Sequence, residues 1–174
     1  MKATWTVAVV YENEDTREAG IAFCDCLAQK FWTRFGFDVS WWPFRLLSDA
    51  SAANEALKRA VEADFVIFSI SAQSEPPEHV RGWIERWVSL RGEREGVLVG
   101  LPLTGAEDLA APAQLHLYLR DVAHRAGMDY LTEVPQNIGP AIPDSPDFFA
   151  ERAQTVTNVL DGILQQQHAR PQWP

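Results

Sequence analysis

Residues 64–71 read DFVIFSIS, and residues 6–11 read TVAVVY. Both runs are short, almost wholly apolar, and rich in β-branched or aromatic side chains. That composition is typical of strands buried on both faces, which occur in parallel sheets covered by helices on either side. These two runs therefore predict the centre of a parallel α/β sheet.

Helical and strand patterns alternate along the rest of the chain. Further strands are predicted over residues 37–44, 97–101 and 129–132, and helices over 15–35, 51–63, 76–91, 112–126 and 145–164. A repeated β-α order requires right-handed crossovers, which place helices on both faces of the sheet. The predicted fold class is α/β, a three-layer α/β/α sandwich around a five-stranded, mostly parallel sheet of order 2-1-3-4-5.

The segment 37–44, FDVSWWPF, carries an unusual number of aromatic side chains. Pro43 has no N–H to donate to a strand ladder, so this strand is predicted at a sheet edge. Trp41 and Trp42 are adjacent and point to opposite faces. We therefore expect Trp41, Trp42 and Phe44 to be interface residues for a protein partner or a homodimer. The alternative is that the first helix or long loops cover them.

The 174 residues and their composition are those of one ordinary globular domain. We expect a single domain over residues 1–164, followed by a polar tail over 165–174. The net charge of −9 argues against nucleic acid or an anionic membrane as partner. No apolar run approaches the roughly 20 residues of a membrane span, and the N-terminus shows no signal-peptide pattern. The expected compartment is the cytoplasm.

Cys24 and Cys26 lie two residues apart on a predicted helix, about 200° around its axis, so they cannot pair with each other. We expect one buried and one surface thiol and no metal site. Nucleotide-binding glycine loops are absent from the sequence. The acidic residues 12–15 after the first strand would repel a flavin phosphate, so no cofactor is expected.

A sheet of order 2-1-3-4-5 binds ligands beyond the carboxyl ends of its first and third strands, where the strand order reverses. The residues predicted to gather there are Tyr11, Glu12, Ser69, Thr104 and Glu133. Four of them also have a purely structural interpretation. Glu12 could complement a helix dipole, Ser69 could be a small residue packed at a strand end, Thr104 could belong to a turn, and Glu133 could be solvated.

Three short stretches resemble the receiver domains of response regulators. They are residues 9–17 (VVYENEDTR), 63–71 (ADFVIFSIS) and 126–133 (AGMDYLTE). Where the family carries an acidic pair, a phospho-accepting aspartate and a lysine, this chain has Tyr11-Glu12, Ser69 and Glu133; Thr104 lies a residue or two beyond the family's Ser/Thr position. The resemblance therefore implies a degenerate receiver, a non-catalytic signalling or protein-interaction module without aspartyl phosphorylation.

An enzyme is the alternative. Residues 69–74, followed by Trp83, Ile84 and Glu85, resemble the part of TIR domains that carries the glutamate of their NAD-cleaving members. The resemblance implies a small enzyme acting on a nucleotide-like substrate at the carboxyl edge of the sheet, with Glu85 as its glutamate. The competing interpretation makes Glu85 a solvated charge on a helix surface.

Overall fold

The computed structural model describes residues 2–71, 75–103 and 111–133. All of them belong to one compact unit. Its elements are β1 Ala3–Tyr11, α1 Glu14–Phe31, β2 Phe35–Pro43, the 3-10 helix η1 Phe44–Ser48, α2 Ala50–Glu62, β3 Phe65–Ser71, α3 Glu78–Arg91, β4 Val97–Leu103, α4 Ala111–Arg125 and β5 Asp129–Leu131.

The five strands form one sheet of order β2-β1-β3-β4-β5, and all four neighbouring pairs are parallel. This is the strand order of a flavodoxin-like fold, and it confirms the predicted fold class. The prediction from Pro43 is also confirmed, because β2 is an edge strand that ends at this residue. β3 lies at the centre, and six of its seven residues are buried.

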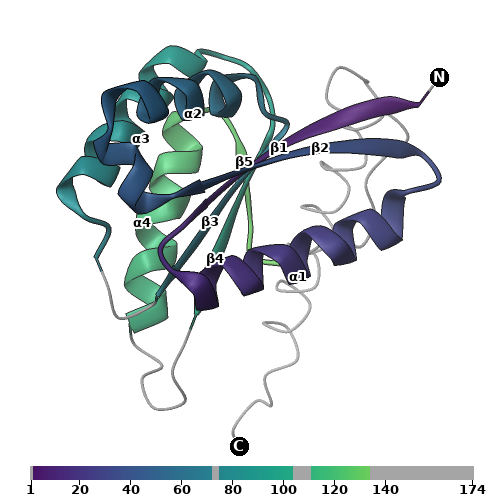
Figure 1. Cartoon of the computed structure of the whole chain (residues 1–174), viewed down its shortest axis with the longest axis horizontal. Coiled ribbons are helices and arrows are strands. Elements are labelled where there is room, and N and C mark those ends of the chain that lie inside the picture. The colour runs from purple at the N-terminus through teal and green to yellow at the C-terminus, as the bar shows by residue number, and fades with distance from the viewer. Residues whose placement is uncertain (1, 72–74, 104–110, 134–174) are drawn as a thin grey trace, which may run out of the picture. The chain divides into compact units, whose positions relative to one another are not determined.

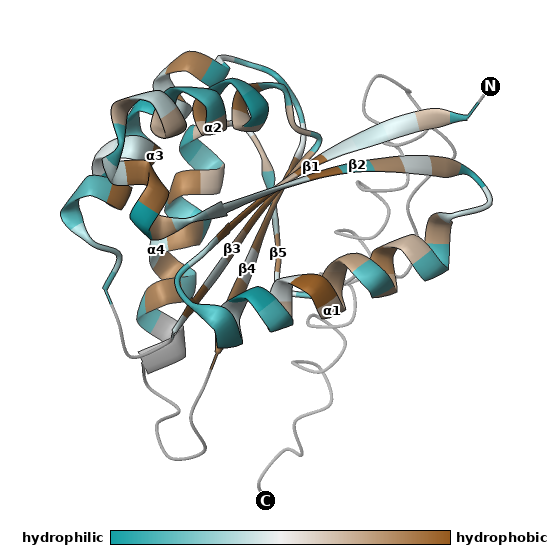
Figure 2. Ribbon diagram, in the orientation of Figure 1, coloured by the Kyte–Doolittle hydropathy of each residue, from teal (hydrophilic) through white to brown (hydrophobic). Residues whose placement is uncertain are grey.

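Helices lie on both faces of the sheet, with α1 on one face and α2, α3 and α4 on the other (Figure 1). Hydrophobic residues concentrate on the central strands between these layers (Figure 2). On the face of α2 to α4, Phe68 packs against Trp83 and Trp87. On the opposite face, Trp5 contacts four aromatic rings, those of Phe31, Phe35, Phe37 and Phe65. Each face of the sheet therefore has its own aromatic core.

The boundary between α1 and β2 differs from the predicted one. The expected helix ran to Phe35 with Gly36 as its stop, whereas α1 ends at Phe31 and β2 already begins at Phe35. The ring of Phe35 stacks on Trp5 of β1 at 4.0 Å. The position of Phe35 in the sheet therefore accounts for its apolar side chain, and its helical spacing from Phe31 is coincidental.

The helix expected over 145–164 and the polar tail over 165–174 lie outside the described residues, so the predicted domain limit at residue 164 stays a prediction. No helix within the described ranges combines the length and the apolar character that a membrane crossing requires.

Candidate functional site

The carboxyl edge of the sheet brings three of the predicted site residues together. Tyr11 of β1 lies beside Ser69 of β3 in the strand register. The next residue, Glu12, donates its backbone N–H to the carbonyl oxygen of Ser69 over 3.2 Å. The first and third strands therefore meet at this edge, as the predicted topology requires.

Ser69 faces the protein interior. Its side chain has no exposed surface, and its hydroxyl donates a 2.6 Å hydrogen bond to the carbonyl oxygen of Thr16 in the first turn of α1. This contact joins the centre of the sheet to α1. In the described structure the hydroxyl is not presented to a ligand, which agrees with the structural interpretation of Ser69.

Glu12 also has an internal partner. One of its carboxylate oxygens accepts a 2.7 Å hydrogen bond from the backbone N–H of Ser71, at the last position of β3. The side chain is half-buried, and its hydrogen bond connects the loop after β1 to the end of β3. One of its oxygens is thus engaged in holding two strand ends together.

The start of α1 is capped by the side chains of Asn13 and Thr16. Asn13 is the N-cap residue, and its side-chain oxygen accepts the N–H of Thr16 over 3.0 Å. The hydroxyl oxygen of Thr16 in turn accepts the N–H groups of Asn13 and Glu12, over 2.8 and 3.0 Å. Helix N-termini bind phosphate through such N–H groups. Here the N–H groups of Glu12, Asn13 and Thr16 already have acceptors, and the exposed carboxylates of Glu14 and Asp15 add negative charge.

Of the other two predicted site residues, Glu133 does not join this cluster. Glu133 is exposed and follows the end of β5, which lies two strands from β3, about 10 Å across the sheet. Thr104 lies outside the described residues. Among the described residues, the cluster at the carboxyl edge consists of Tyr11, Glu12 and Ser69, together with the start of α1.

The predicted interface residues occupy three different environments. Trp41 is half-buried on the face of α1, where it meets Tyr11 edge-on with ring centroids 6.5 Å apart. Trp42 is half-buried on the opposite face, packs on the core and donates its indole N–H to the hydroxyl of Ser40. Phe44 is 4% exposed and belongs to the core. Trp41 and Trp42 thus point to opposite faces as predicted, and Phe44 is not on the surface.

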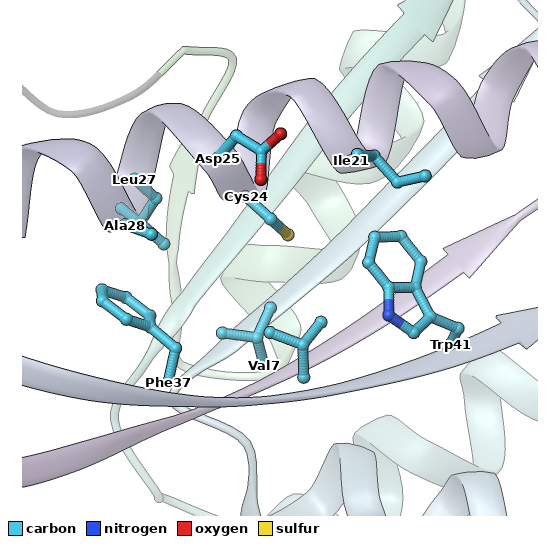
Figure 3. A pocket seen from close by; sticks show the side chains of 9 residues that line it. Val7, Ile21, Cys24, Asp25, Leu27, Ala28, Phe37 and Trp41 are labelled. Atoms are coloured by element: carbon cyan, nitrogen blue, oxygen red, sulfur yellow. The ribbon is translucent and has the colours of Figure 1, made fainter. Parts of the chain in front are cut away.

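A cavity of about 250 Å³ lies between α1 and β2 (Figure 3). The sequence did not reveal it, because Cys24 has the helical spacing of a core residue. Most of the lining is apolar: Val7, Ile21, Cys24, Asp25, Leu27, Ala28, Phe37, Val39 and Trp41. Burial, and secondarily the neighbouring Asp25 carboxylate, raises the pKa of the Cys24 thiol to about 12. Cys26 is exposed, and Cys24 is half-buried in the cavity wall.

Glu85, the glutamate of the enzyme alternative, lies on the outer surface of α3. Both of its carboxylate oxygens accept hydrogen bonds from the guanidinium of Arg125 on α4, over 2.7 and 2.9 Å. These bonds hold the pKa of Glu85 below its ordinary value. Within the described residues, no group of three or more His, Cys, Asp or Glu side chains is placed to hold a metal ion.

No family model and no curated protein matches this chain. Among solved structures, a mutant flavo di-iron protein from Thermotoga maritima is 15% identical with a TM-score of 0.46; the match covers 78% of this chain and 31% of that one. The Trp repressor binding protein from Bacillus subtilis is 14% identical with a TM-score of 0.44, over 75% of this chain and 86% of that one. This chain therefore spans about a third of the flavo di-iron protein. At such identities the likeness concerns the fold alone.

Proposed function

We propose that this flavodoxin-like domain is a non-catalytic, receiver-like module that binds a protein partner or a second copy of itself. The observation that carries the proposal is the state of the carboxyl edge, where the side chains that would perform chemistry are hydrogen-bonded to backbone groups of the domain. Ser69 is fully buried against Thr16, and Glu12 is bonded to the backbone of Ser71. Groups held in this way stabilise the fold rather than receive a substrate.

The proposed partner surface is the open side of β2. Among the described strands, this nine-residue strand pairs with β1 alone. An edge strand presents unpaired backbone N–H and C=O groups, which favour pairing with another chain. Phe37, Val39 and Trp41 are half-buried on the face of α1, so they add apolar surface beside this edge. Large aromatic residues contribute much of the binding energy at protein interfaces.

Replacing Trp41 by Glu tests the proposal, with Trp32→Glu as the matched control. Trp32 is 62% exposed and lies just beyond α1, outside β2. Sedimentation velocity of the full chain over a wide concentration range measures self-association, and quantitative capture of partners by the immobilised full chain measures hetero-association. We expect Trp41→Glu to weaken whichever association occurs by about tenfold or more, since a charge would replace a buried aromatic anchor. Trp32→Glu should leave it unchanged.

A parent protein that is monomeric throughout and captures nothing specifically contradicts the proposal. So does an association that Trp41→Glu and Trp32→Glu weaken equally. Circular dichroism and urea unfolding establish that each variant is folded.

An assay of NAD cleavage addresses the enzyme alternative. We expect no turnover, because the Arg125 guanidinium engages both oxygens of Glu85; turnover that Glu85→Gln abolishes would favour the enzyme.

A further inference from the structure

The cavity between α1 and β2 has the size and the walls of a site for one aromatic ring. Its volume of about 250 Å³ lies just below the roughly 300 to 1,000 Å³ of sites for drug-sized ligands. Aliphatic side chains of α1 and of the strands face one another across it, and Phe37 and Trp41 of β2 also line it (Figure 3). Several of these side chains are only half-buried, so a ring placed between them would remove further apolar surface from water.

Trp41 is held in place on two sides. Its ring lies close to Gly20 of α1, where an added Cβ would come within 3.4 Å of the ring and 3.1 Å of Val9. Tyr11 contacts the same indole edge-on. Because Gly20 has no side chain, the indole of Trp41 can lie against α1. This indole forms a fixed part of the cavity wall.

The indole N–H of Trp41 is an unused donor. The indole N–H groups of Trp42, Trp83 and Trp87 donate to Ser40, Ala53 and Ala60, respectively. That of Trp41 has no acceptor among the described residues. Figure 3 shows its nitrogen on the side of the ring that faces the other lining residues. A ligand with a hydrogen-bond acceptor on its ring would satisfy this donor.

The lining contains one acidic residue. Asp25 is exposed and lines the cavity, so this residue lies at the rim. Cys24 is the other titratable lining residue, and its thiol stays protonated because burial raises its pKa to about 12. The rim therefore favours a cation over an anion.

We propose that this cavity binds a small aromatic ammonium compound with a hydrogen-bond acceptor on its ring. The ring lies between α1 and the aromatic residues of β2, the ammonium group pairs with Asp25, and the acceptor receives the N–H of Trp41. The site goes beyond the proposed function, since it requires no partner protein.

Tyramine is the probe, because it joins a phenol ring, whose oxygen can accept a hydrogen bond, to a short ammonium chain. Titration of the full chain followed by ligand-observed NMR should give a dissociation constant of about 1 mM or tighter for a ligand of this size. 3-(4-Hydroxyphenyl)propionate has the same ring and a carboxylate in place of the ammonium. We expect it to bind about fivefold or more weakly, since the rim charge would repel it.

Three variants locate the site. Asp25→Asn should weaken tyramine binding about twofold to fivefold, as the loss of one exposed ion pair predicts. Asp15→Asn changes the net charge equally on an exposed residue of α1 outside the lining and should have no effect. Trp41→Phe keeps an aromatic wall without the donor, so it should weaken tyramine but not phenethylamine, which lacks the ring oxygen.

The inference is overturned if tyramine does not bind at 5 mM, roughly five times the weakest dissociation constant expected. It is equally overturned if the propionate binds as well as tyramine, or if Asp25→Asn and Asp15→Asn act alike. Association defects of the Trp41→Glu variant do not enter this test. Failure of the proposed function and failure of the ligand site are therefore distinguishable.

Discussion

Ser69 stands where the proposed receiver likeness would place a phospho-accepting aspartate, and its surroundings do not suit a charge. The side chain has no exposed surface, and its hydroxyl points at the carbonyl oxygen of Thr16. An aspartate there would bring a carboxylate against a carbonyl oxygen without water. We expect Ser69→Asp to lower the free energy of unfolding by about 3 kcal/mol or more, or to prevent folding.

Ser69→Ala is the matched control, because it removes the hydroxyl without adding charge or bulk. It should cost about 1 kcal/mol, the usual contribution of one hydrogen bond. Urea unfolding of the parent and both variants gives the two differences. A Ser69→Asp variant as stable as Ser69→Ala would mean that the carboxyl edge opens to solvent, and the receiver-type site would regain support.

Cys24 should be far less reactive than its exposed neighbour Cys26. With a pKa raised to about 12, only about one Cys24 thiol in 10⁴ is ionised at pH 8, and the thiolate is the nucleophile. The raised pKa means that the thiolate fraction grows about tenfold for each pH unit up to that value. Alkylation by iodoacetamide, followed by peptide mass spectrometry, should modify Cys26 first and Cys24 increasingly as the pH rises. Equal rates at pH 8 would contradict this account of the cavity wall.

The polar residues at the carboxyl edge could be selected from the sequence, but their bonding could not. Glu12 and Ser69 follow or end predicted central strands, so topology alone brings them together. Whether such residues face a ligand or the interior depends on hydrogen bonds over large sequence separations, such as that from Ser69 to Thr16. No local pattern encodes these contacts, and the sequence therefore left both interpretations open.

At the scale of elements, Arg91 of α3 joins three parts of the fold. It is 4% exposed, and its guanidinium donates to the carbonyl oxygens of Ala60 and Val61 on α2 and of Arg94 and Glu95 before β4. Replacing it by Met would remove this donor from the carbonyl oxygens of Val61, Arg94 and Glu95, whereas that of Ala60 would keep the indole N–H of Trp87. We expect Arg91→Met to cost about 3 kcal/mol of unfolding free energy.

Arg91→Lys separates the role of geometry from that of charge. An ammonium group is a compact point charge and does not reproduce the planar fork of donors, so Lys should recover less than half of the loss. Gly96 supports the same arrangement, since a Cβ there would collide with the Arg91 guanidinium and come within 2.9 Å of the Asp64 carbonyl oxygen. Urea unfolding at pH 7 measures the variants, and full stability of Arg91→Met would show that water replaces the guanidinium.

The elements themselves were largely predictable because their signals are local. Glycine ends α3 and follows α4, where Gly92 and Gly127 have positive φ angles of 65° and 66° that suit glycine. The end of α1 was predicted too late, because Phe35 extends the helical spacing of Phe31 by chance. Only the pairing of Phe35 with β1 and its stacking on Trp5 distinguish strand from helix there. Nothing in the sequence indicated that Arg91 is buried, since a single arginine in a helix is usually exposed.

At the scale of the whole domain, two features of the sequence were compatible with the observed strand order. Buried apolar runs placed residues 6–11 and 64–71 at the centre, and Pro43 placed its strand at an edge. The cavity could not be predicted, because it depends on the distance at which α1 lies from β2. That distance is set by contacts between distant residues, such as Gly20 with Val9 and Trp41.

The arrangement of the whole domain also predicts how it responds to a phosphoryl donor. A receiver holds Mg²⁺ with several carboxylates and needs an aspartate as acceptor, whereas this carboxyl edge combines Glu12, already bonded to Ser71, with a buried serine. We expect intact-mass spectrometry after incubation with acetyl phosphate and Mg²⁺ to show no adduct, under conditions in which an active receiver is phosphorylated. Titration calorimetry should likewise show no Mg²⁺ binding tighter than about 1 mM. This cation gives up its water ligands reluctantly, and a single carboxylate that already accepts a hydrogen bond does not replace them. A stoichiometric, base-labile adduct would contradict the proposed non-catalytic role, because it would show that a carboxylate of this domain accepts phosphate.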